Sequence, residues 1–327
     1  LRDDYDVVAR ALATHGAVAL PRPSERSPPA AVGFASPPSS PTSPASARSA
    51  AALRHASELA DLSLRYFERG GWACALDALG ATVEALAPPK QAYGPDGAVG
   101  GSDERAALEL LNGVATRAVV KGRDLLSSGA AGAHASQLFE FLKRYLLLCP
   151  AALFAPPQLL ALVWDLSLAH LEASDVSLGS DGAKENVVFL GHLAKKAEAA
   201  PGAFAAPFVQ ANLGHLRARG AAAVRGLVAK LAGPAPSTLR PALAECLHAV
   251  CAPAPDMARD WLGGALADAA LFDARTLPLE ERGRVHAALC GLLPEKPKFK
   301  ALAVDLAKIA CGEASVDALL AYEMPAH

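Results

Sequence analysis

Aromatic side chains are scarce in this chain, and neither sign of charge is in excess. Only 6% of the 327 residues are Phe, Trp or Tyr, whereas 52% are hydrophobic, so Ala and Leu supply most of the packing surface. This composition suits close contact between helices better than a β-sandwich or barrel, whose strands favour aromatic and β-branched residues. The formal net charge of -2 gives no broad basic field, so we expect no direct nucleic-acid partner.

The chain also lacks a disulfide framework and a zinc motif. Of its six cysteines only Cys246 and Cys251 lie close together, and no two have the CxxC spacing of a zinc site. We therefore interpret the cysteines as small apolar core residues in a reducing compartment.

Long apolar runs are absent as well. None reaches the roughly 20 residues that a membrane-spanning helix needs, so we expect no membrane insertion. The start, LRDDYDVV, is acidic where a signal peptide would be basic. Because the first residue is Leu1 rather than Met, we expect the chain to be a fragment of a longer protein.

Catalytic motifs are missing too. The sequence has no HExxH pair, no GxSxG elbow and no Walker glycine loop, and its histidines are scattered singly. The acidic residues Asp3, Asp4 and Asp6 would need a second acidic cluster to hold Mg²⁺, and the sequence offers none. We therefore expect neither an enzyme nor a bound cofactor or metal.

What the chain does contain is an unbroken succession of Leu- and Ala-rich segments separated by short loops with Pro and Gly. The expected helices span 3–20, about 50–70, 72–86, 103–126, 133–149, 156–171, 181–199, 205–231, 237–250, 256–271, 278–293, 297–311 and 314–322. An interior glycine costs about 1 kcal/mol relative to alanine. We therefore expect the long segment 205–231 to break into two helices near Gly220.

The pattern divides the chain into three parts. Residues 1–20 are expected to form a short helix, the Pro/Ser-rich stretch 21–49 a disordered linker or loop, and residues 50–327 a series of helical hairpins. The hairpins recur about every 40 to 50 residues, the spacing of HEAT-type repeats. Since such hairpins cannot each bury a core alone, the sequence predicts an all-α fold, an α-solenoid of HEAT-like antiparallel hairpins with an armadillo-like superhelix.

Two groups of basic residues form the candidate partner-binding site. An acidic or phosphorylated peptide would suit such a face, and the ordinary alternative is a solvated surface. Arg217 and Arg225 are eight positions apart, so they share one helix face only if the helix continues through Gly220. The candidate residues are Lys195, Lys196, Arg217, Arg219, Arg225 and Lys230.

Two tryptophans have alternatives of their own. Trp164 and Trp261 lie in the apolar helical patterns LVWDL and RDWLGGAL, which favours burial between helices. The alternative is a pocket that accepts an apolar side chain of a partner. We expect Trp261 to be buried together with Leu262 and Leu266.

Five collinear segments carry a family resemblance. They are QLFEFLKRYLLLCPAALFAPPQLLALVWDLSLAHLEASD at Gln137–Asp175, KENVVFLGHLAKK at Lys184–Lys196, PAPSTLRPALAECLHAV at Pro234–Val250, MARDWLGGAL at Met257–Leu266 and LPLEERGRVHAALCGLL at Leu277–Leu293. In this order they resemble the C-terminal part of the importin-β superfamily, specifically transportin-SR and its near importin relatives. The likeness covers roughly residues 137–293.

The resemblance implies the C-terminal, cargo-side segment of a nuclear transport receptor that shuttles between nucleus and cytoplasm. Binding would be non-catalytic, on the helical-repeat surface, and the partners would be protein cargo, including serine/arginine-rich nuclear proteins. The contact with the Ran GTPase would lie in an N-terminal part that is absent from this chain. The alternatives are a generic HEAT-repeat scaffold or adaptor subunit of the phosphatase or coat type and an α-helical enzyme.

Overall fold

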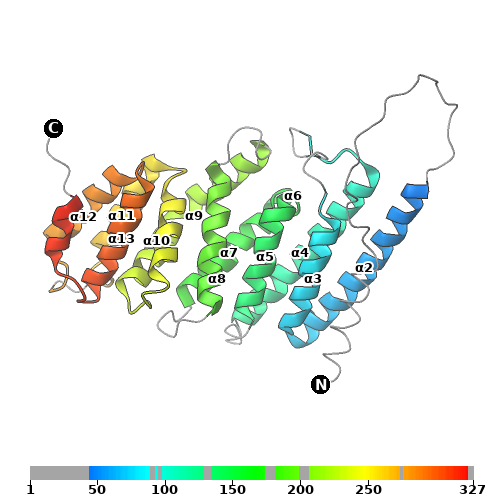
Figure 1. Cartoon of the computed structure of the whole chain (residues 1–327), viewed down its shortest axis with the longest axis horizontal. Coiled ribbons are helices and arrows are strands. Elements are labelled where there is room, and N and C mark those ends of the chain that lie inside the picture. Colours follow the sequence, from blue (N-terminus) through cyan, green and yellow to red (C-terminus); the bar gives the residue numbers. More distant parts are fainter. Residues whose placement is uncertain are drawn as a thin grey trace, which may run out of the picture.

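The computed structural model describes residues 44–88, 93–94, 98–127, 134–173, 181–198, 206–272 and 275–322 (Figure 1). Within these ranges the protein is all-α, as the sequence predicts, and Tyr93 and Val99 form only an isolated antiparallel bridge. None of the helices in these ranges is long and apolar enough to cross a bilayer.

The described residues form twelve α-helices and two short 3-10 helices. They are α2 (Pro44–Gly70), α3 (Ala73–Leu86), α4 (Ser102–Ser127), α5 (Ala135–Leu148), α6 (Pro150–Phe154), α7 (Pro157–Ala173), α8 (Asp181–Lys195), η4 (Lys196–Glu198), α9 (Ala206–Ala232), α10 (Arg240–Cys251), α11 (Pro255–Ala267), α12 (Leu279–Leu292), α13 (Lys296–Ala310) and η5 (Val316–Tyr322).

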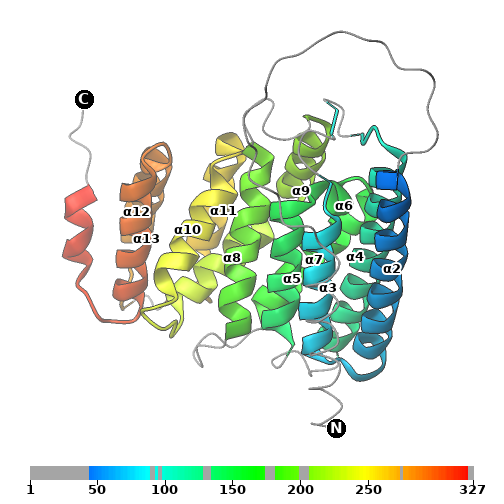
Figure 2. The ribbon, with the colours of Figure 1, turned by 45° about the vertical axis from the view of Figure 1, so that its right-hand side comes forward.

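The helices lie in two rows, which run from α2 at one end to α12 and η5 at the other (Figures 1 and 2). The first row contains α2, α4, α7, α9, α11 and α12, each packed on the next. The second row contains α3, α5, α8, α10 and α13, again in contact one after another. Each helix therefore packs both on its neighbours within a row and on a helix of the other row.

The helix ends follow local chemistry. Gly71 and Gly312, with φ of 65° and 72°, stop α2 and α13 in the left-handed conformation that glycine adopts without a steric penalty. Prolines lie in the first turns of α10, α11 and α13, where no backbone donor is lost. Short connections between successive helices therefore come from the Pro and Gly positions of the sequence.

The buried apolar side chains form one continuous cluster that extends from Ala60 in α2 to Leu319 in η5. Trp164 and Tyr145 are its largest fully buried members. Trp261 is also buried, at 7% exposure, with Leu262 and Leu266, as the sequence predicts. The buried cluster thus extends along the two rows of helices.

The expected break in the long helix is wrong, because α9 runs without interruption from Ala206 to Ala232. A Cβ at Gly220 would lie 2.5 Å from Cζ2 of Trp261, and one at Gly226 would lie 2.9 Å from Cδ2 of Leu171. The glycines therefore let α11 and α7 approach α9 closely. The packing gained outweighs the cost of glycine in a helix interior.

Two further boundaries differ from expectation. Helix α2 begins at Pro44, so the last six residues assigned to the linker are helical. The short helix α6 at Pro150–Phe154 follows α5 directly and was not expected, because the sequence places only a loop after Cys149. The expected helix 3–20 and the rest of the linker lie outside the described residues.

Candidate functional site

The six candidate basic residues do not form one surface. Lys195 ends α8 and Lys196 begins η4, in the second row, whereas the other four lie on α9 in the first row. We therefore consider the two groups separately.

On α9 the basic side chains mainly join neighbouring helices. Arg219 donates two hydrogen bonds to the carboxylate of Asp165 on α7. The distance from Nε to Oδ1 is 2.7 Å, and that from Nη2 to Oδ2 is 3.2 Å. Arg225 Nε donates to Oδ2 of Asp268, just after α11, at 3.0 Å. Arg219 and Arg225 are therefore already paired with carboxylates of this chain. Little remains of the basic helix face that was expected to bind an acidic peptide.

The other two candidate residues on α9 are Lys230 and Arg217. Lys230 Nζ donates to the backbone oxygen of Glu172 at the end of α7, at 3.2 Å. Arg217 is exposed, and no ion pair involves it among the described residues. Arg217 and Arg225 lie on one continuous helix, as the sequence requires for a shared face, but only Arg217 is unmatched.

The second row contains a denser group, which we call the Glu245 cluster: Lys195, Glu245, Lys296 and Lys300. Lys195 Nζ and Lys296 Nζ each lie 2.7 Å from Glu245 Oε1, and Lys300 Nζ lies 2.7 Å from Oε2. The side chains remain accessible, with 44% exposure for Lys195 and Lys296, 35% for Lys300 and 27% for Glu245. One carboxylate thus holds three ammonium groups at the surface.

Three helices build this cluster. The helices α8, α10 and α13 pack side by side in the second row (Figures 1 and 2). Lys195 closes α8, Glu245 lies midway along α10, and Lys296 and Lys300 are four positions apart on α13, which brings them to one face. The N-cap of α13 is Glu295, whose charge lies at the positive end of the helix, and the first turn itself carries no acidic residue.

The electrostatics of the cluster are dominated by the lysines. Burial acts to raise the pKa of Glu245, but its hydrogen bonds to the three ammonium groups lower that pKa far below the usual value. Burial, with Lys195 and Lys143 next, lowers the pKa of His192, and burial likewise lowers the pKa of His248. The lowered pKa values favour the neutral form of both imidazoles, and the three ammonium groups with one carboxylate give the cluster a surplus of two positive charges.

Sequence reasoning found only one member of this cluster as a site residue. Lys195 is among the six basic residues predicted from the sequence, whereas Lys296 and Lys300 are not. The ion pairs join residues at least 50 positions apart in the sequence, so no local motif predicts them. A four-residue lysine spacing at the start of a helix was the one available indication.

Nucleophilic and metal-binding chemistry is not assembled in the described part of the chain. All six cysteines are free, and burial raises the pKa of Cys246 and Cys251, which disfavours their reactive thiolates. No group of three or more His, Cys, Asp or Glu side chains that could hold a metal ion occurs among the described residues.

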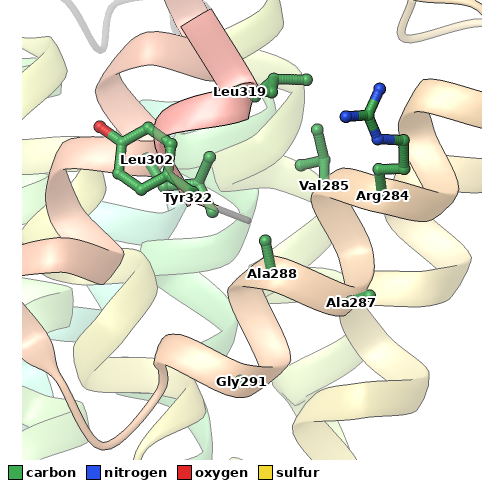
Figure 3. Close-up of a pocket in the computed structure, with 8 residues that line it drawn as sticks. All are labelled: Arg284, Val285, Ala287, Ala288, Gly291, Leu302, Leu319 and Tyr322. Atoms are coloured by element: carbon green, nitrogen blue, oxygen red, sulfur yellow. The ribbon is translucent and has the colours of Figure 1, made fainter. Parts of the chain in front are cut away.

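A cavity of about 440 Å³ lies at the C-terminal end of the rows, between α12, α13 and η5 (Figure 3). Leu302 and Tyr322 lie across it from Arg284, and the other five lining residues are all Ala, Val, Leu or Gly. Arg284 is bonded to Glu281, and the Tyr322 hydroxyl donates to Asp305 at 2.6 Å. The cavity suits an apolar group and has no paired acid and base.

Comparison of the chain with protein-family models and with curated proteins finds no match.

Proposed function

We propose that this chain is an α-solenoid of HEAT-like hairpins that binds a protein partner without catalysis. The observation that supports the proposal is the pair of helix rows, along which one continuous cluster of buried apolar side chains extends. Stacked hairpins of this kind bury their apolar faces only against their neighbours, which leaves long surfaces free for partners. The Glu245 cluster on the second row is the charged surface that we assign to binding.

We further propose that the partner is cargo of a nuclear transport receptor, and that the chain is a cargo-side segment moving between nucleus and cytoplasm. This part of the proposal is supported by the order of the five segments in residues 137–293. Serine/arginine-rich nuclear proteins are the cargo class that the resemblance suggests, and Ran would act through another part of the receptor.

Binding of the purified chain to serine/arginine-rich segments, measured by titration calorimetry, tests the cargo proposal. A saturable complex between these segments and the folded chain supports it. In a longer version of the protein, GTP-bound Ran should release the same cargo. If neither the segments nor Ran bind, the transport proposal is rejected in favour of a scaffold or adaptor subunit, which the same fold allows.

A further inference from the structure

The Glu245 cluster holds more positive charge than its own structure requires. Three ammonium groups, one from α8 and two from α13, surround the carboxylate of Glu245 on α10, each at 2.7 Å. Among the neighbouring charged residues, Lys298 is paired with Glu295, and η4 contains one basic and one acidic residue, Lys196 and Glu198. A surplus of two positive charges therefore remains at one accessible point between α8, α10 and α13.

We propose that this point binds a phosphorylated serine or threonine of the protein partner, and that Glu245 is a built-in counterion which the phosphate displaces. The inference deepens the proposed function, since it takes the partner to be a protein. In the free protein Glu245 keeps the three lysine side chains gathered. When the phosphate enters between the lysines, its oxygens replace the Glu245 carboxylate as the acceptors of the ammonium hydrogen bonds.

Charge and donor number favour a phosphate over a carboxylate as the ligand. A phosphomonoester carries about -1.5 to -2 charge at pH 7 and three strong acceptor oxygens. Three ammonium groups provide one donor direction for each oxygen, and the surplus of two charges matches the dianion. A side-chain carboxylate would leave one lysine and one charge unmatched.

The surroundings favour a single phosphate on a peptide over a membrane or a nucleic acid. None of the large exposed hydrophobic side chains of the described residues lies on α8, α10 or α13, so this face lacks apolar anchors for a bilayer. The positive surface also ends at α5, where Lys143 is bound by Glu140 and Glu185. A nucleic acid would need a longer basic track.

Binding of a short labelled Gly/Ser peptide with one phosphoserine, followed by fluorescence anisotropy, tests the inference. The unphosphorylated peptide and one with Asp at the same position serve as comparisons. We expect Lys296→Gln and Lys300→Gln each to weaken phosphopeptide binding about fivefold. Glu245→Gln should strengthen it about tenfold, because the competing charge is gone while the side-chain shape is kept.

Lys298→Gln is the matched control, since Lys298 lies on the same helix, is 64% exposed and pairs with Glu295. It should leave binding unchanged. Thermal unfolding of each variant shows whether a loss of binding follows from a loss of folding. Equal binding of the phosphorylated and unphosphorylated peptides, or weaker binding by Glu245→Gln in a folded protein, would overturn the inference.

Two further arms separate sources and proposals. Vesicles of phosphatidylcholine with a phosphoinositide should not bind better than the same vesicles without it, and preferential binding to the phosphoinositide would overturn the peptide assignment. Phosphopeptide binding without any binding of serine/arginine-rich segments or Ran would leave this inference standing while rejecting the transport proposal. Cargo binding that is unchanged by phosphorylation and by replacement of Lys296 or Lys300 would leave the transport proposal standing and reject this inference.

Discussion

At the scale of single residues, buried amides tie the rows together. Asn212 on α9 is fully buried, accepts a 2.9 Å hydrogen bond from Nε1 of Trp164 on α7, and donates a 2.7 Å bond to the backbone oxygen of Leu193 on α8. One side chain thus satisfies groups on both neighbouring helices. Polar groups buried in this way are costly when their partners are removed.

Replacing Asn212 by Leu should therefore lower the free energy of unfolding by about 2 to 4 kcal/mol, because the indole N–H of Trp164 loses its buried partner. Urea unfolding followed by circular dichroism measures the change. Gln210→Leu on the same helix is the control, since Gln210 is exposed. Similar stability for Asn212→Leu and the control would show that the amide contributes little.

A buried histidine makes the fold sensitive to acid. His170 on α7 packs edge-on against Phe139, and its Nδ1 has no hydrogen-bond partner in the described part of the chain. Burial, followed by the charge of Lys230, lowers the pKa of His170 from 6.5 to about 4. The unfolded chain therefore binds a proton between pH 6.5 and about 4 that the folded chain excludes, and stability falls as the pH falls through this window.

We expect His170→Leu to make the loss of stability between pH 6.5 and 4 shallower, by at most about 1.4 kcal/mol per pH unit. Thermal unfolding at a series of pH values measures the slope. His55→Gln is the control, because the side chain of His55 is 77% exposed on α2. An unchanged slope for His170→Leu would show that His170 is protonated equally in both states.

At the scale of helices, α9 and α11 are fitted to one another through Gly220 and the Trp261 ring. Trp261→Ala should cost roughly 3 to 5 kcal/mol through the cavity that it leaves. Gly220→Ala should destabilise the wild-type protein by a steric clash with the ring. In the Trp261→Ala background the same change should stabilise by up to about 1 kcal/mol, because alanine is the better helix former.

The double-mutant cycle of these two substitutions, measured by denaturant unfolding, isolates their coupling. Gly214→Ala on α9 is the control, since a Cβ there meets no atom within 4 Å, and it should not depend on Trp261. Additive effects of Gly220→Ala and Trp261→Ala would contradict the proposed fit.

The helices also show which features of the structure can be predicted from the sequence. Apolar periodicity and the Pro and Gly positions predict nearly all helices of the described residues, because helix ends depend on local chemistry. Within the uninterrupted α9, Gly220 lies against the ring of a tryptophan 41 positions further along, a contact that intrinsic helix propensity does not contain. The Glu245 cluster depends likewise on contacts between distant helices, so sequence reasoning recovers Lys195 and misses its partners.

At the scale of the whole molecule, the proposed solenoid shares its stability among neighbouring hairpins. An ion pair stabilises the C-terminal end of the rows. The guanidinium of Arg240, buried at the start of α10, donates two hydrogen bonds of 2.5 Å to Glu313, which follows α13. At the other end, the stacked rings of Tyr66 and Trp72 are 37% and 39% exposed, next to Leu62 on α2. The two ends of the rows are therefore not equally secured.

Hydrogen exchange should reveal this difference as a gradient. Amides of α2 and α3 should exchange fastest among the helices, because the described part of the chain packs on one side of these helices only, and amides of α7 to α10 slowest. Small-angle scattering should give a radius of gyration above the ~20 Å expected for a compact sphere of this length. Uniform protection together with a value near ~20 Å would mean that one cooperative core holds all the helices, and the solenoid, with the extended binding surface it provides, would have to be abandoned.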